Sequence, residues 1–180
     1  ALRGMLRGWA PMKPNTALCF ILNGLALLLS QIPSVRFDRN KAARTGWSGF
    51  LALLLMLPIL VCLLTLGEYL FAGNLPIDAL LINERLAAPG NPGAFRMAPE
   101  SAISHILLAV AIWLNMHPSL ARRRVMVSAF LSVMVVALAV SAMSTYFSPV
   151  LGMFGWFGLS VMAGDTAILF MLLGTASFLI

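Results

Sequence analysis

Long apolar runs restrict the folds that this sequence can adopt. Of its 180 residues, 61% are hydrophobic and 10% are charged, and the mean hydropathy is +0.94, whereas a soluble domain has about 25% charged residues. A membrane-spanning helix needs about 20 mostly apolar residues. Runs of this kind predict spans at 15–33, 47–71, 99–116, 124–147 and 161–180. We therefore expect an all-α, polytopic transmembrane bundle of about five spans, forming a single integral membrane domain over 1–180.

Basic residues are concentrated in two of the connections between the runs, and the net charge of the chain is +6. An excess of lysine and arginine marks the cytoplasmic side of a membrane. With five antiparallel spans, this pattern predicts an outside N-terminus and a cytoplasmic C-terminus. Topology and anionic lipid headgroups explain the basic patches, so we expect no nucleic acid. The topology-determining residues are Arg36, Arg39, Lys41, Arg44, Arg122, Arg123 and Arg124.

A similar nine-residue pattern occurs at the start of three apolar runs. These matching segments read MKPNTALCF at 12–20, MAPESAISH at 97–105 and MAGDTAILF at 162–170. Tyr69 and Tyr146, at the ends of the preceding runs, form a weaker match and are expected at the outer interface, where aromatic rings accumulate. The repeating unit is thus an outgoing helix, an outside connection, a matching segment and a returning helix. The first unit lacks its outgoing helix, which predicts a truncation at the N-terminus.

The polar residues of the matching segments have two interpretations. Short polar side chains accept hydrogen bonds from the free N–H groups of a first helical turn, and a carboxylate there meets the positive end of the helix dipole. They are therefore helix caps, or they converge on one polar pocket in the outer leaflet. The candidate residues for either role are Asn15, Thr16, Glu100, Ser101, Asp165 and Thr166, together with Glu68 and Tyr69 at the end of the second run.

His105 stands where the other two matching segments have phenylalanine. An ionisable residue inside a span is a functional candidate by default. His117 is twelve residues away, about 18 Å along one helix, so one chain cannot clamp a haem iron between the two. A haem or pigment contact at His105 and a hydrogen-bonded structural histidine both remain open. The sequence contains no HExxH, P-loop or GxSxG motif, so we expect no metal site and no enzyme.

Three stretches resemble a known membrane region: GWAPMKPNTALCFILNGLALLL at 8–29, LTLGEYLFAGNLPIDALLI at 64–82 and RMAPESAISHILLAVAIWL at 96–114. They are similar to a multi-pass input region that precedes PAS, histidine-kinase and GGDEF modules in bacterial signalling proteins. Residues 12–20 match its M-x-P-N-T-A-L-x-F pattern. The resemblance implies a bacterial inner membrane location and a cytoplasmic output module after Ile180. The second matching segment departs from the pattern at Glu100, Ser101, Ser104 and His105.

Three functions stay open on the sequence. The chain is a sensory or anchoring region for a small or lipid-like signal, an accessory subunit of a respiratory or photosynthetic membrane complex in contact with pigment or lipid, or a transporter. For transport, which usually needs polar groups near the midplane, the best residue is Asn23, which looks isolated. Expected partners are lipids, other membrane subunits or a second copy, and no cofactor is required. Small residues favour helix association at Ser128, Ser132, Ala137, Ser141 and Ala142.

Overall fold

The described part of the chain is helical throughout. The computed structural model describes residues 12–32, 45–71, 96–116, 122–147 and 162–180, and these contain five α-helices and no strand. The helices are α1 (Pro14–Ser30), α2 (Thr45–Phe71), α4 (Pro99–Met116), α5 (Arg122–Phe147) and α7 (Gly164–Phe178). The all-α helical bundle that the sequence predicts is therefore confirmed.

Three of the described helices are long and apolar enough to cross a membrane, namely α2 over Gly49–Phe71, α4 and α5. The apolar helices α1 and α7 have 17 and 15 residues, fewer than the about 20 that a straight span needs. The runs predicted at 15–33 and 161–180 were thus too long. Pro33 follows α1 closely, and proline disfavours the α conformation in the residue before it.

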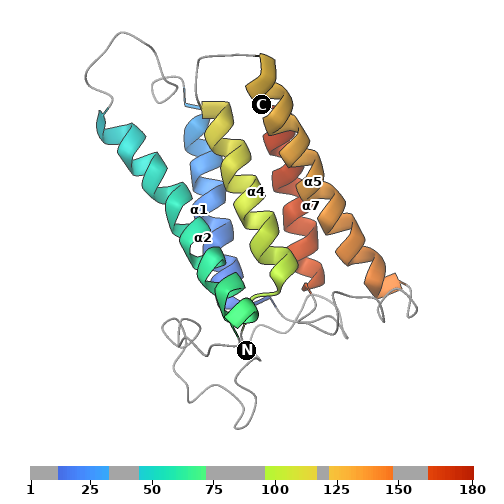
Figure 1. The fold of residues 1–180 in the computed structure, drawn as a ribbon. Coiled ribbons are helices and arrows are strands. Elements are labelled where there is room, and N and C mark those ends of the chain that lie inside the picture. Colours follow the sequence, from blue (N-terminus) through green and yellow to red (C-terminus); the bar gives the residue numbers. More distant parts are fainter. Residues whose placement is uncertain (1–11, 33–44, 72–95, 117–121, 148–161) are drawn as a thin grey trace.

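The helices form an inner group with two helices on its flanks. The helices α1, α4 and α7 each contact the other two, and we call them the inner helices. The outer helix α2 packs against α1 and α4, and the outer helix α5 packs against α4 and α7. Figure 1 shows α2 and α5 on opposite flanks of the bundle. All three inner helices begin at the same end, at the bottom of Figure 1, which we call the convergent end.

Polar and apolar side chains are distributed as in a membrane protein. Large apolar side chains are exposed on the outer helices, for example Leu53, Leu60 and Phe130. Polar side chains are buried inside the bundle, including those of Asn23, Ser104 and His105. A soluble monomer rarely exposes so large an apolar surface, whereas lipid can cover it. The distribution agrees with the membrane-spanning lengths of α2, α4 and α5.

Small residues bring α5 and α7 close together. A Cβ atom added at Gly174 would lie 2.8 Å from Cγ2 of Val136 and 3.3 Å from the backbone oxygen of Ser132. Nearby, the Ser132 hydroxyl donates to the Ser177 hydroxyl over 3.1 Å. Small residues and hydroxyl groups are common at contacts between membrane helices, where they allow close approach. Of the small residues expected to favour association, Ser132 is thus placed at an interhelical contact.

The packing at Gly174 predicts the effect of adding one methyl group there. Gly174→Ala should lower the free energy of unfolding by about 1–3 kcal/mol, because overpacking a tight contact forces its neighbours to shift. Thermal unfolding of the purified protein in detergent measures the effect. Gly49→Ala is the matched control, because a Cβ atom there meets no described atom within 4 Å. Equal stability of the two variants would contradict the tight contact.

Candidate functional site

The three matching segments occupy equivalent places on the inner helices. The third residue of each segment is the first residue of a helix: Pro14, Pro99 and Gly164. The helices begin there because proline at the first position has no N–H to leave unpaired and its φ angle is already helical. Glu100 and Asp165 consequently lie in the first turn, where a carboxylate meets the positive end of the helix dipole.

These helix boundaries correct the interpretation of Asn15, Glu100 and Asp165 as N-cap residues. Asn15, Glu100 and Asp165 are second residues of their helices and not the residues that precede them. The N-cap residues of α1 and α7 are Lys13 and Ala163, and within the described part of the chain neither makes a capping hydrogen bond with its side chain. The sequence predicted helix starts at residues 15, 99 and 161, whereas the helices begin at Pro14, Pro99 and Gly164.

The fifth residue of each matching segment points into the bundle. These residues, Thr16, Ser101 and Thr166, are at most 2% exposed. They line a common cavity of about 10 Å³. A cavity of this size has room for about one water molecule. The structure therefore brings these three hydroxyl residues together, whereas Asn15, Glu100 and Asp165 are not among the residues that line this cavity. The other residues that line the cavity are Lys13, Ala98, Met162 and Ala163.

A layer of three rings lies about one helical turn deeper. It consists of the last residues of the matching segments, Phe20, His105 and Phe170, and all three are buried. Each pair of rings has its centroids 4.6 Å apart, within the range in which aromatic rings attract one another. The inner helices thus meet around a common axis through corresponding residues.

His105 forms a polar pair with Asn23 inside this layer. The side-chain nitrogen Nδ2 of Asn23 lies 3.2 Å from Nδ1 of His105, and both residues are fully buried. Because an amide nitrogen only donates, Nδ1 accepts in this arrangement. Leu108 and Leu173 occupy the positions that correspond to Asn23 in the other two segments. Asn23 is therefore not isolated, and the pair replaces two residues that are apolar elsewhere in the pattern.

Further unpaired polar atoms lie within the bundle. Among the described residues, Oδ1 of Asn23 and Oγ of Ser104 are buried without a hydrogen-bond partner. Nε2 of His105 is likewise buried without a hydrogen-bond partner among the described residues. The described residues contain no group of three or more histidine, cysteine or acidic side chains that could hold a metal ion. His117 lies outside the described residues.

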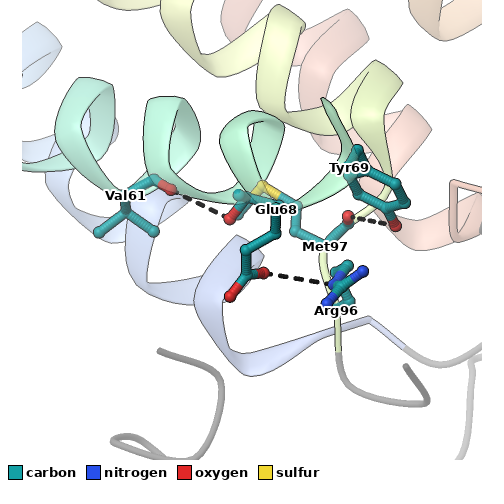
Figure 2. Close-up of polar contacts among 6 residues, drawn as sticks. Val61, Glu68, Tyr69, Arg96 and Met97 are labelled. Carbon is teal, nitrogen blue, oxygen red and sulfur yellow. Dashed lines mark hydrogen bonds and ion pairs between the residues drawn. The ribbon is translucent and has the colours of Figure 1, made fainter. Parts of the chain in front are cut away.

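Glu68 and Tyr69 attach the end of α2 to the start of α4 (Figure 2). The Tyr69 hydroxyl donates to the backbone oxygen of Met97 over 3.1 Å. The nearly buried carboxylate of Glu68 lies 3.2 Å from Nε of Arg96, whose guanidinium carbon is 5.2 Å from the centroid of the Tyr69 ring. A buried carboxylate needs such a partner, because its desolvation is otherwise costly.

Tyr146 makes the corresponding contact between α5 and α7. Its hydroxyl donates to the backbone oxygen of Met162 over 2.7 Å. The two tyrosines therefore bind the first residue of the following matching segment, and both of the methionines are fully buried. Sequence reasoning placed these tyrosines at the membrane interface and missed their hydrogen-bond acceptors. The sequence signal that could have indicated these contacts is the equivalent position of the two tyrosines ahead of their matching segments.

The topology-determining residues fall into two groups. Arg122, Arg123 and Arg124 are exposed at the start of α5, at the end of the bundle opposite the convergent end (Figure 1). The others lie outside the described residues: Arg36, Arg39, Lys41 and Arg44.

Comparison with known proteins gives no match for this chain, whether with family models, curated proteins or solved structures.

The Asn23–His105 pair predicts non-additive effects of substitution. Asn23→Leu and His105→Phe should each lower the free energy of unfolding by about 1–3 kcal/mol, because each leaves one buried polar group unpaired. The double variant should recover most of that loss, because it restores the apolar residues of the corresponding positions. Thermal unfolding of the four proteins in detergent measures the coupling. Losses that simply add would show that the two side chains do not interact.

Proposed function

We propose that this chain is the non-catalytic sensory and anchoring region of a bacterial inner-membrane signalling protein. The convergence of Thr16, Ser101 and Thr166 around one cavity is the observation that carries the proposal. The signal is a small polar molecule or a polar group of a lipid that reaches the convergent end. The similarity of residues 8–29, 64–82 and 96–114 to membrane input regions supports the same function.

The convergent end has the chemistry to recognise a small acceptor group. Three helices begin there, and a helix start presents N–H groups that lack partners within the helix as well as the positive end of the helix dipole. Three hydroxyl residues and Lys13 add further hydrogen-bond donors around the cavity. A cavity of about 10 Å³ admits a single small group, so a larger ligand has to separate the inner helices.

This separation provides a route for the signal. A ligand shifts a conformational equilibrium only if it binds one arrangement better than the other, and a ligand that inserts between the inner helices meets this condition. The helix α7 leads from the cavity at Ala163 and Thr166 to Phe178, at the opposite end of the bundle. In the proposed protein, an output module follows this helix in the cytoplasm and responds to its displacement.

Replacing the hydroxyl groups at the cavity tests this proposal. In the natural full-length gene product, the triple variant Thr16→Val, Ser101→Ala and Thr166→Val should change the kinase or cyclase output severalfold in native membranes. Its melting temperature should change little, because the substitutions nearly conserve volume.

The control for this experiment is Ser144→Ala, since Ser144 is half-buried on α5 and its hydroxyl donates to the backbone oxygen of Ser141 in the same helix. It should leave output unchanged. Intact-mass analysis of the same preparation identifies the module. A gene product that carries no output module and purifies with other membrane subunits would instead support an accessory subunit and contradict the sensory function.

The orientation of the bundle follows from the same proposal. The convergent end faces outside, because the exposed arginines at the start of α5 lie at the other end and basic residues mark the cytoplasmic side. In intact cells, Asn91→Cys should react with a membrane-impermeant thiol reagent, and Ser119→Cys, close to Arg123, should not. The native Cys19 and Cys62 are buried, which keeps the background low. Labelling of Ser119→Cys from outside would reverse the orientation.

A further inference from the structure

Each outer helix covers the same face of the inner helix that follows it. On α4 this face contains Met97, Ala102 and Ile106, which pack with Cys62 of α2 and its neighbours. On α7 the corresponding residues Met162 and Ala167 are fully buried. Further along the same face, Gly174 lies against Val136 and Ser132 of α5.

No described helix covers the corresponding face of α1. Ala17 is half-buried, whereas Ala102 and Ala167 are fully buried. Ile21 is 59% exposed, and a Cβ atom added at Gly24 meets no described atom within 4 Å. The position that is in tight contact on α7 is therefore open on α1.

The adjoining face of α7 is uncovered as well. On α1 and α4 this second face is covered, by α2 and α5 respectively. Ala26 of α1 and Ala111 of α4 lie on it and are fully buried. The Ser128 hydroxyl of α5 donates to the backbone oxygen of Ala111. On α7 the corresponding Ala176 is only half-buried, and Leu172 is 62% exposed. Both sides of the groove between α1 and α7 thus lack the outer helix that the other two grooves hold.

We propose that a sixth helix, which precedes α1 in the same polypeptide, packs in the groove between α1 and α7. It is antiparallel to α1 and completes a bundle of three inner and three outer helices. The order of the chain identifies this occupant: among the described helices α2 comes before α4 and α5 before α7, and each covers the inner helix that comes after it. By the same correspondence, this helix ends in a hydroxyl-bearing aromatic residue that donates to the backbone oxygen of Met12. The proposal is independent of the sensory function.

Gly24 occupies the position that corresponds to Gly174, where α5 leaves no space for a side chain. Glycine weakens a helix interior relative to alanine, and a helix that packs against α1 as closely as α5 packs against α7 gives a reason to keep it. Leu172, Ile21 and Leu25 supply the apolar walls of the groove.

Photocrosslinking in native membranes tests the position of this helix. A benzoylphenylalanine is incorporated at Ile21 of the natural full-length gene product, the membranes are irradiated, and the crosslinked peptides are identified by mass spectrometry. We expect a crosslink within one molecule to a peptide N-terminal to Met12. The same probe at Leu60, which is exposed on α2, is the control and should reach lipid. Crosslinks from Ile21 to lipid only, to a second copy or to another protein would overturn the proposal.

A second measurement uses the sign of a stability change. In the same full-length protein, Gly24→Ala should lower the melting temperature by several degrees, as we expect for Gly174→Ala. Gly49→Ala, in open space on α2, should leave it equal or slightly higher, because alanine favours the helix. A Gly24→Ala variant that behaves like Gly49→Ala would show that no helix lies against α1.

Discussion

The contact of the three inner helices along one axis is the constraint on which the other features of the bundle depend. Lipid is as apolar as leucine, so helices in a membrane associate through close packing and polar contacts and not through the hydrophobic effect. Here the packing comes from the rings of Phe20, His105 and Phe170, at 4.6 Å from one another. The outer helices then pack in the grooves between the inner ones, and Tyr69 and Tyr146 fix their ends to the starts of α4 and α7.

Features that depend on neighbouring residues could be predicted from the sequence, whereas features that depend on distant ones could not. The apolar runs predicted the helices because a hydrophobic run leaves little choice in lipid. The start of α4 at Pro99 was predicted correctly, whereas the starts of α1 at Pro14 and of α7 at Gly164 were misplaced. The matching segments suggested that Thr16, Ser101 and Thr166 have equivalent places. Asn23 and His105 are 82 residues apart, and no local pattern indicates that they form a pair.

The polar pair is more informative because its surroundings follow a regular pattern. Two of the three rings at the axis are phenylalanine, and two of the three residues at the position of Asn23 are leucine. A fully apolar version of this layer is therefore within reach of two substitutions. Burying a polar pair costs desolvation that the hydrogen bond only partly offsets. Natural proteins depart from locally favourable choices mainly at functional sites, so in the proposed sensory function this layer takes part in the response to a ligand.

The cavity and the polar pair are connected along α1. Thr16 lines the cavity, and Asn23 on the same helix bonds to the His105 ring. A change in the spacing of the inner helices at the cavity therefore alters the geometry of the polar pair, because both lie between the same helices. An apolar layer of rings can slide with little change in energy, whereas a hydrogen bond loses strength steeply with distance and angle. The pair thus gives the bundle a preferred arrangement, and in the proposed sensory function a ligand at the convergent end has to overcome it.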